Sequence, residues 1–556
     1  MKEILFDKIL PNVLRPARYI GNELHSIHKN WADVSLHVAL AYPDVYEIGM
    51  SNLGLQILYH IINQRSDALA ERVFAPWPDM ENQLLTHELK LLSLESFTPL
   101  DKFDLLGFSL GHELTYTNIL TILKLGGIPW RRTERGENDP LILGGGPCTF
   151  NPEPVADFFD FFVVGEAEEA INEILDSLKK TSGQSRRAKL LALSEISGVY
   201  VPGISAAVVK RSVQDLDAAP CPEKPIVPFI EAIHDRAVIE IMRGCQWGCK
   251  FCQAGWTSRP VREKSPEKIL QLAKELVKNT GYNELSLISL SSSDYSKIEA
   301  VAKQLAEKYA AQRINLSLPS MRTNTFSVKL AREISRVRSS GVTLAPEAGT
   351  QRLRDLIGKN MTEEQILEGV QAAFSEGIES IKLYFMIGLP TETEEDLQGI
   401  CTLSKKIVEL GRSFTRRVRV SANLATFIPK PHTPLQWAPQ ISIEETIAKQ
   451  KFIKMNMSRK NIEVRWHHAE ASFLEGVFSR GDRQLSALIE KAWSLGARLD
   501  AWSEHLNFSL WQNAFQAAGI NPENYLRARE LDEPLPWDYV NTGISKETLR
   551  HAADKN

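Results

Sequence analysis

The sequence predicts an α/β protein in three parts: an N-terminal doubly wound parallel sheet, a partial (β/α)6 barrel and a helical C-terminal region. Apolar runs alternate with amphipathic segments over residues 31–215 and again over residues 236–442, which predicts the sheet and the barrel. Prolines at positions 220, 222, 225 and 228 mark residues 216–235 as the linker between them. Residues 443–556 are rich in tryptophan and carry mostly helical patterns.

The N-terminal part begins with a polar extension over residues 1–30, and its domain spans residues 31–215. Expected strands cover residues 34–41, 72–75, 103–110, 140–144 and 160–164, with helices such as 53–63 and 117–125 between them. Ligands of such parallel sheets bind at the carboxyl ends of the strands, where this chain has glycine-rich segments. No Gly-x-Gly-x-x-Gly follows the first strand, which argues against a dinucleotide site.

The barrel part contains six expected strands, at residues 237–242, 284–290, 314–318, 342–344, 380–387 and 417–424. Amphipathic segments such as residues 265–279 and 297–310 fill the gaps between them as helices. Six strand–helix units over roughly 190 residues suit an open, partial barrel better than a closed eight-unit one. The fold class therefore follows from periodicity alone.

Composition and charge narrow the class of protein. Hydrophobic residues make up 43% and charged residues 24% of 556 residues, as in an ordinary globular protein. The net charge of −4 argues against a dominant nucleic-acid surface and leaves a local basic patch possible. The sequence contains no run of 18 apolar residues, so it predicts no membrane span. The first residues do not have the pattern of a signal peptide. Six cysteines are too few for a disulfide scaffold, so we expect a reducing, cytoplasmic location.

Three of these cysteines, Cys245, Cys249 and Cys252, lie together just after the first expected barrel strand. Thiolates are the usual ligands of iron–sulfur clusters, and three ligands on a four-iron cluster leave one iron open to a substrate. A structural zinc usually takes four ligands in two pairs, and the nearest other cysteine, Cys221, lies in the linker. Zinc and incidental burial are therefore the weaker interpretations of the cysteine loop.

The Cys-x3-Cys-x2-Cys spacing, with the aromatic Phe251 before the last cysteine, resembles the signature of radical S-adenosylmethionine (SAM) enzymes. The resemblance covers residues 230–440 and implies a radical SAM barrel with a [4Fe–4S] cluster whose open iron chelates the methionine part of SAM. It also implies a reductant, such as flavodoxin or ferredoxin, whose electron lets the cluster cleave SAM to a 5′-deoxyadenosyl radical. The substrate is unknown.

The segments at the strand ends resemble the SAM contacts of that family in their order along the chain. Residues 289–294 depart from the Gly-Gly-Glu-like segment that is usual in that family. The resemblance implies SAM contacts at Phe251, Ser291, Ser292, Ser320, Arg322, Glu347, Tyr384, Gly388, Pro390 and Pro429.

The segments 141–147 and 163–169 resemble the cobalamin-binding domain that precedes many radical SAM barrels. Many such domains have a cobalt-ligating histidine after the first strand, but residues 42–54 contain none. The domain then either binds cobalamin without that ligand or binds none. The resemblance implies cobalamin contacts at Ser51, Ser109, Gly144, Gly145, Gly146 and Glu166.

These resemblances predict a radical SAM enzyme, with a cobalamin-dependent methyltransferase as the leading hypothesis. The alternative is a radical SAM enzyme of other chemistry whose N-terminal domain only recognises its substrate, for example RNA or a protein. A third hypothesis is a non-enzymatic iron–sulfur or zinc scaffold. Fold alone does not choose among substrates.

Overall fold

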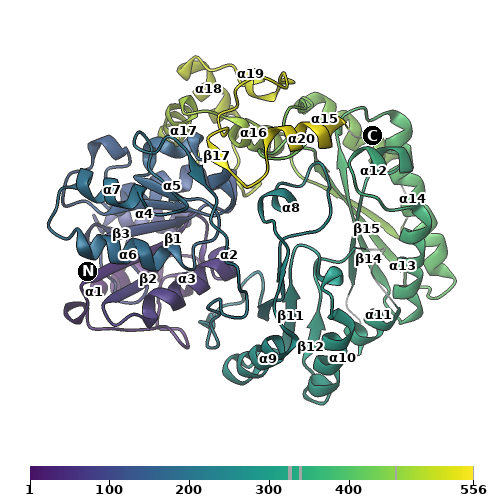
Figure 1. Ribbon diagram of the computed structural model, residues 1–556, viewed down its shortest axis with the longest axis horizontal. Helices are drawn as coiled ribbons and strands as arrows, with labels where there is room; N and C mark the ends of the chain where they lie inside the picture. The colour runs from purple at the N-terminus through teal and green to yellow at the C-terminus, as the bar shows by residue number, and fades with distance from the viewer. Residues whose placement is uncertain (323–327, 337–340, 458–459, 555–556) are drawn as a thin grey trace.

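A computed structural model describes residues 1–322, 328–336, 341–457 and 460–554. The predicted α/β class is confirmed: one domain with a parallel sheet lies beside a second, larger arrangement of strands and outer helices (Figure 1). The yellow C-terminal segment runs across the top of both halves. Within the described residues, every helix is too short or too polar to cross a membrane.

The N-terminal sheet has the strand order β2-β1-β3-β4-β5-β6. The five predicted strands are present and parallel, as β1 (Leu36–Tyr42), β2 (Ala68–Phe74), β3 (Leu105–Ser109), β4 (Leu141–Gly145) and β5 (Phe161–Val163). An unpredicted short strand, β6 (Val199–Tyr200), pairs antiparallel with β5. Because the chain winds outward in opposite directions from β1 and β3, their carboxyl ends form the switch point where such sheets bind ligands.

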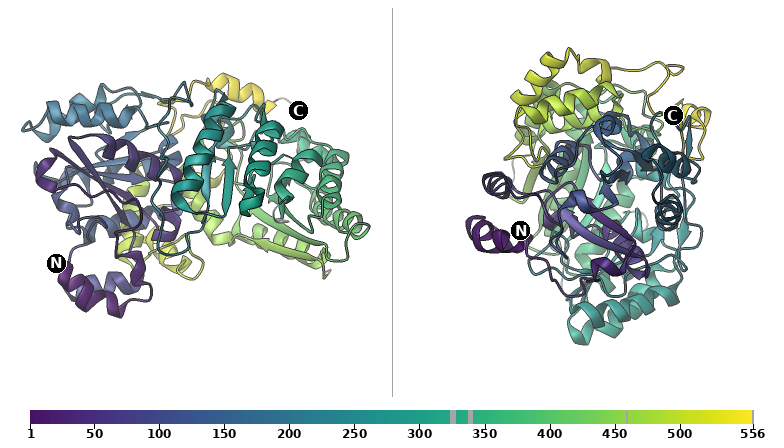
Figure 2. Two further views of the ribbon diagram at one scale, coloured as in Figure 1. Left: turned by 90° about the horizontal axis from the view of Figure 1, so that it is seen from below. Right: turned by 90° about the vertical axis from the view of Figure 1, so that its left-hand side faces the viewer.

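Helices cover both faces of this sheet. On one face, α3 (Leu53–Gln64) and α6 (Ala170–Lys180) pack on apolar side chains of the strands. On the other, α5 (Tyr116–Leu125) shares a core with three helices of the C-terminal region, namely α16 (Ala469–Arg480), α17 (Gln484–Ser494) and α18 (Phe508–Ala518). Figure 2 shows these yellow-green helices beside the N-terminal domain. The C-terminal helices therefore complete the N-terminal core, which their periodicity alone does not reveal.

The extension before residue 31 also belongs to this domain. Arg18 pairs with Glu47 at 2.9 Å, and Glu23 pairs with Arg72 at 2.7 Å, all four side chains being buried. Buried charges must be paired to be tolerated, so these contacts tie the extension to β2 and to the short helix α2 (Tyr46–Gly49) that follows β1.

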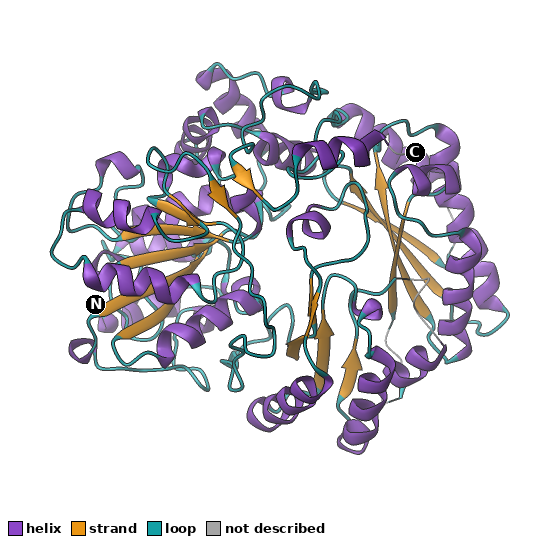
Figure 3. Cartoon of the chain, in the orientation of Figure 1, coloured by secondary structure: helices purple, strands orange, loops and turns teal. Residues whose placement is uncertain are grey.

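The six predicted barrel strands are all present, in two parallel sheets (Figure 3). The first sheet contains β8 (Ala237–Glu240), β11 (Glu284–Ile288) and β12 (Asn315–Ser317). The second contains β13 (Val342–Glu347), β14 (Ser380–Ile387), β15 (Arg419–Thr426) and an additional strand, β16 (Ile462–Trp466). Among the described strands no ladder joins the two sheets, which agrees with an open barrel.

The outer helices of the barrel follow the strands in order. They are α9 (Pro266–Thr280), α10 (Ile298–Tyr309), α11 (Val328–Ser335), α12 (Gln351–Leu356), α13 (Glu363–Ser375), α14 (Glu394–Arg412) and α15 (Ile443–Asn456). β16 lies beyond residue 442, in the region expected to be mostly helical. Its five residues alternate between apolar and charged, which is the pattern of a half-buried strand.

Residues 537–554 return to the barrel. β17 (Val540–Asn541) pairs in parallel with β7 (Val208–Val209), and α20 (Lys546–Asp554) follows it. Trp537 is buried with Trp256 and Leu549, and its indole Nε1 donates to Gln436 Oε1 at 2.8 Å. The C-terminal segment is thereby held against the helix that follows the cysteine loop.

Candidate active site

The cysteine loop connects β9 (Met242–Arg243) to α8 (Gln253–Thr257). Gly244 has φ +89°, and a Cβ there would lie 2.6 Å from the Pro260 carbonyl oxygen, so the turn into the loop requires glycine. Cys249 is buried, while Cys245 and Cys252 are partly exposed. A Cβ on Gly248 would meet nothing within 4 Å, so open space adjoins the loop.

The thiols of this loop suit a cluster with one open iron. Burial raises the pKa of Cys245, and it raises the pKa of Cys252 to about 11, so a bound metal must displace their protons. The other three cysteines lie elsewhere: Cys148 and Cys401 are in the two main cores, and Cys221 packs against the barrel. The donor set is therefore three thiols from one short loop, which fits the ligand chemistry of iron–sulfur clusters.

The ends of β11 and β12 adjoin this loop. Asp294 Oδ2 accepts from Trp247 Nε1 at 2.5 Å and from Ser291 Oγ at 2.5 Å, so it joins the cysteine loop to the segment after β11. The backbone N–H of Ser292 donates to the Ser320 carbonyl at 2.6 Å, and its buried hydroxyl donates to the Leu287 carbonyl. The predicted residues Ser291, Ser292 and Ser320 thus lie at one junction, where the Ser292 hydroxyl is already bonded to backbone.

Arg322 brings the third strand end to the sulfurs. Its Nη1 lies 3.8 Å from Cys249 Sγ, and its Nη2 donates to the Lys359 carbonyl at 2.7 Å. Lys359 is buried, and its Nζ pairs with Glu347 Oε1 at 3.1 Å. The backbone of Glu347 adopts a left-handed φ of +68°. The predicted Arg322 and Glu347 therefore belong to one network beside the cysteine loop, linked by Lys359, which sequence reasoning missed.

The segments after the fourth, fifth and sixth barrel strands supply an apolar wall. Phe251 packs against a buried cluster of residues from these last three barrel units, which contains Ala348, Leu353, Ile357, Leu389, Phe427 and Leu435. Gly388 has φ +81° and donates its N–H to Glu392 Oε2 at 2.8 Å. Pro429 is buried, Pro390 is half-buried, and the half-buried Tyr384 ring faces Lys382 Nζ at 4.9 Å. Phe251 is thereby brought to the strand ends that carry Gly388 and Pro429.

A cavity of about 420 Å³ opens at the carboxyl edge of the N-terminal sheet. It passes between the sheet and helices α3 and α6, and side chains such as Leu40, Leu143 and Ile174 make its interior apolar. Its rim includes the predicted residues Ser109, Gly145, Gly146 and Glu166. The barrel contributes Glu240, Arg243 and Ile288, so the cavity lies between the two halves of the molecule and ends two residues before Cys245.

Two predicted cobalamin residues lie outside this cavity. A Cβ on Gly144 would lie 2.6 Å from the Phe162 ring, so this glycine serves the packing of neighbouring strands. Ser51 Oγ accepts from the backbone N–H of His234 at 3.0 Å and lines a separate, smaller hollow. By contrast, a Cβ on Gly145 would meet nothing within 4 Å, and Gly146 adopts φ +107°. Of the three predicted glycines, Gly145 and Gly146 therefore line the cavity, whereas Gly144 does not.

Glu166 is engaged by the barrel. Its oxygens pair with Arg262 at 2.8 Å and with Arg243 at 3.1 Å. Burial alone would raise the pKa of Glu166. The hydrogen bond from Arg262 and the charge of Arg243 outweigh burial and hold this pKa below its usual value. The carboxylate thus joins the two domains at the cavity mouth, a role that the sequence does not indicate.

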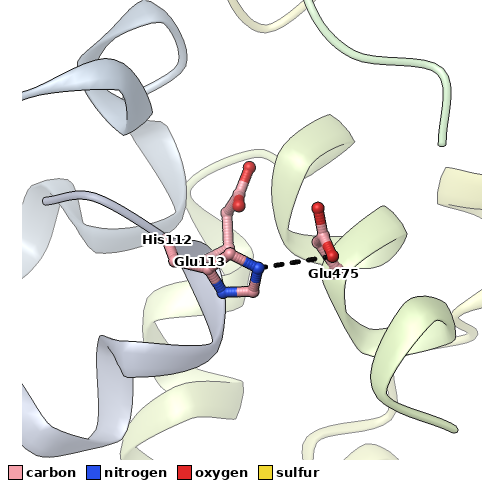
Figure 4. Close-up of side chains that lie close together, drawn as sticks. All are labelled: His112, Glu113 and Glu475. Carbon is pink, nitrogen blue, oxygen red and sulfur yellow. Dashed lines mark ion pairs between the residues drawn. The ribbon is translucent and has the colours of Figure 1, made fainter. Parts of the chain in front are cut away.

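A second charged group joins all three parts of the molecule. Lys430, from the segment after β15, has its Nζ 2.7 Å from Glu113 Oε1, 2.8 Å from Glu475 Oε1 and 2.7 Å from Ser479 Oγ. His112 Nε2 lies 3.4 Å from Glu475 (Figure 4). Because the ammonium already bridges both carboxylates, this group is an ion-paired junction between the halves.

Comparisons with known proteins cover both halves. Residues 54–202 match the family described as "Radical SAM proteins, N-terminal", and residues 239–403 match the "Radical SAM superfamily". An uncharacterised protein of Methanocaldococcus jannaschii is 27% identical, over 87% of this chain and 97% of that protein. An uncharacterised methyltransferase of Pyrococcus horikoshii is 26% identical, over 49% of this chain and 59% of that protein.

A solved structure shares the fold: the cobalamin-dependent SAM radical enzyme OxsB, with aqua-cobalamin bound, superposes with a TM-score of 0.53. It is 14% identical, and the match covers 93% of this chain and 78% of OxsB. The two family matches coincide with the two halves found here, and the cysteine loop lies after the first strand of the second half. The chain therefore belongs to the radical SAM superfamily.

Proposed function

We propose that this chain is a cobalamin-dependent radical SAM methyltransferase. In this proposal Cys245, Cys249 and Cys252 hold a [4Fe–4S] cluster, SAM binds at its open iron, and cobalamin binds at the cavity between the halves. When bound, the reduced cluster would supply the electron that cleaves SAM to methionine and a 5′-deoxyadenosyl radical. The cobalamin would supply the methyl group for the substrate.

The observation that carries the proposal is the position of the cavity. It opens at the β1/β3 switch point, where parallel sheets bind ligands, and its far wall is the strand that leads into the cysteine loop. The proposed cobalamin site therefore adjoins the strand that leads into the cysteine loop. The fold shared with OxsB, whose structure holds aqua-cobalamin, supports the same assignment.

The cavity residues fit cobalamin by shape and polarity. Gly145 and Gly146 carry no side chain, so backbone can approach a bulky ligand at the rim. The interior is apolar and about 420 Å³ in volume, which suits the nucleotide tail of a cobalamin. Gly107, in the middle of β3, leaves the space that a longer side chain would fill. The absence of histidine from residues 42–54 means that this loop supplies no imidazole to cobalt.

On the barrel side, the residues of this chain bind, orient and exclude water. In the proposal, Arg322 and the Lys359–Glu347 pair provide charges for the polar groups of SAM, beside the loop that holds the cluster. Phe251 and its apolar neighbours keep water from the adenine side. None of the six cysteines is paired in a disulfide, which agrees with a protein that works in the reducing cytoplasm.

Anaerobic reconstitution with iron, sulfide, SAM and dithionite tests the proposal. We expect about four irons per chain, formation of 5′-deoxyadenosine, and tight retention of added cobalamin. Cys249→Ala should lose the cluster absorbance and the deoxyadenosine. Its matched control, Cys401→Ala, removes a buried thiol in α14 and should keep both.

Deoxyadenosine formation without any retention of cobalamin would reject the methyltransferase and favour an enzyme whose N-terminal domain only recognises its substrate. Failure of the reduced protein to cleave SAM would reject radical chemistry altogether.

A further inference from the structure

A second hollow, of about 660 Å³, lies on the outer side of the cysteine loop. Cys245 and Gln246 form part of its wall, together with Trp256 and residues 259–261 from the segment after α8. The strand β7 and the following residues supply a second side, and the C-terminal residues 542–544 and Thr548 supply the third. Three segments that are far apart in the sequence thus enclose an approach to the first cysteine.

The charge of this hollow is one-sided. Its lining includes Lys210 and Arg259 and contains no aspartate or glutamate, although the whole chain carries a net charge of −4. Lys210 Nζ donates to the carbonyls of Thr257 and Arg259, at 2.8 and 2.7 Å. The Arg259 guanidinium donates to the carbonyls of Gly255 and Trp247, at 3.1 and 3.0 Å, so both cations are held in place. The hollow is therefore a fixed positive site on a protein that is negative overall.

Its rim is apolar and exposed. Val209 is 58% exposed and Val261 is 40% exposed, and the exposed Pro260 lies beside Val261. A positively charged floor with an apolar rim is the combination that steers and then holds an acidic protein partner, since charge speeds encounter and apolar contact slows release.

We propose that this hollow is the docking surface for a small acidic one-electron carrier protein that reduces the cluster. The inference rests on the proposed function, because only a protein with a cluster on Cys245 needs an electron there. The carrier gives up one electron and is oxidised, and the cluster takes up this electron and passes it to SAM. The sulfonium C–S bond of SAM then breaks to give methionine and the deoxyadenosyl radical.

The local contacts explain why the electron enters on this side. Arg322 and Asp294 hold Trp247, on the inner side of the loop, whereas Cys245 lies partly exposed in the hollow. Arg259 stacks on Trp256 at 4.4 Å and donates to the Trp247 carbonyl at 3.0 Å, so the floor of the hollow is attached to the cysteine loop. A carrier seated here reaches the cluster without entering the SAM or cobalamin sites.

The test compares two reductants on the same reconstituted holoenzyme. SAM cleavage is measured once with flavodoxin and its reductase, and once with dithionite, which needs no docking surface. The double variant Val209→Glu/Val261→Glu places negative charge on the rim. We expect it to lower the flavodoxin-driven rate about 10-fold at low salt, with the dithionite-driven rate within about 2-fold of the parent.

Two controls make the result specific. Val209→Lys/Val261→Lys perturbs the same rim but should keep or increase the flavodoxin-driven rate, and Leu191→Glu adds a charge at a similarly exposed apolar residue, on α7 (Arg186–Ser194). The parent rate with flavodoxin should also fall with added salt, and that of the glutamate variant should respond less.

Equal flavodoxin-driven rates in the parent and the glutamate variant would overturn the docking surface. An equal loss in the lysine and glutamate variants would overturn it as well, because the effect would then not depend on charge. Failure of the parent to cleave SAM with dithionite would instead reject the proposed function.

Discussion

The guanidinium of Arg322 lies 3.9 Å from the centre of the Trp247 ring, so a residue from the end of β12 stacks on the middle of the cysteine loop. At this distance a cation and an indole attract each other appreciably. The same guanidinium is 3.8 Å from Cys249 Sγ and donates to the Lys359 carbonyl. One side chain therefore positions the loop and places positive charge beside a proposed cluster ligand.

The first prediction concerns the reduction potential of the cluster. Removing the cation with Arg322→Met leaves the negative charge added on reduction less compensated, so reduction becomes harder. At an effective dielectric constant of about 20, a unit charge near 5 Å corresponds to a shift on the order of 100 mV toward negative potential. A redox titration followed by electron paramagnetic resonance measures this shift.

Arg465→Met is the control, because Arg465 pairs with Glu463 on the exposed side of β16. It should leave the potential unchanged. The same potential in the Arg322 variant and the parent would show that Arg322 acts only by holding the loop.

The second prediction concerns the junction at Glu166. Glu166→Gln leaves Arg262, which is 8% exposed, without its charged partner, and removing one member of a buried ion pair costs about 3 kcal/mol. We expect the urea midpoint of the apoprotein to fall. Glu169→Gln, three residues later, breaks the pair of an exposed glutamate with Arg211 and should cost less than about 1 kcal/mol.

A small, equal effect of both glutamine variants would mean that the domains are held together elsewhere, for example by Lys430 and its two carboxylates. The double variant with Lys430→Met would then separate the two junctions. If the two junctions are independent, the losses of unfolding free energy caused by the two substitutions should add.

Periodicity predicted the strands well because each strand carries its own pattern. All six barrel strands and all five parallel N-terminal strands begin within four residues of their predicted positions. β16 was missed because its five residues follow a helix and lie in a region of helical patterns. The helices α16–α18 cover a face of the N-terminal sheet through contacts with residues more than 300 positions away. For example, the indole N–H of Trp493 donates to the Thr121 hydroxyl.

The candidate site was predictable where a short motif carried it. The cysteine spacing identifies the loop, and the glycine run identifies the sheet edge. Trp247, Asp294 and Lys359 were missed because no motif marks a residue whose partner comes from another strand end. Glu166 stands in a recognisable segment, but its partner Arg262 is 96 residues away, so only the fold reveals the pairing.

The third prediction tests the cavity by filling it. A Cβ on Gly107 would lie 3.6 Å from Leu40 and 3.8 Å from Leu143, so alanine fits while leucine projects into the space. We expect Gly107→Leu to lose cobalamin retention and to keep its cluster absorbance and deoxyadenosine formation. Gly107→Ala should retain cobalamin. Retention by both variants would place the ligand outside this cavity.

The last prediction concerns pH and the buried His432, whose Nε2 lies 3.0 Å from the Phe150 carbonyl of the N-terminal domain. Burial lowers the pKa of His432 to about 4, whereas the unfolded chain has an ordinary value near 6.5. The unfolded state therefore takes up the proton first. The contribution of neutral His432 to the stability of the folded state is fully present above about pH 6.5 and is lost as the pH falls toward 4.

The full loss approaches about 3 kcal/mol near pH 4, and at pH 5 about 2 kcal/mol is expected from this group. Asparagine tolerates the φ of +58° at this position, so His432→Asn is the variant of choice. Urea unfolding of the apoprotein at pH 7 and pH 5 should show a smaller decrease for the variant than for the parent. An equal decrease in both would mean that other groups, rather than His432, take up the proton when the domains come apart.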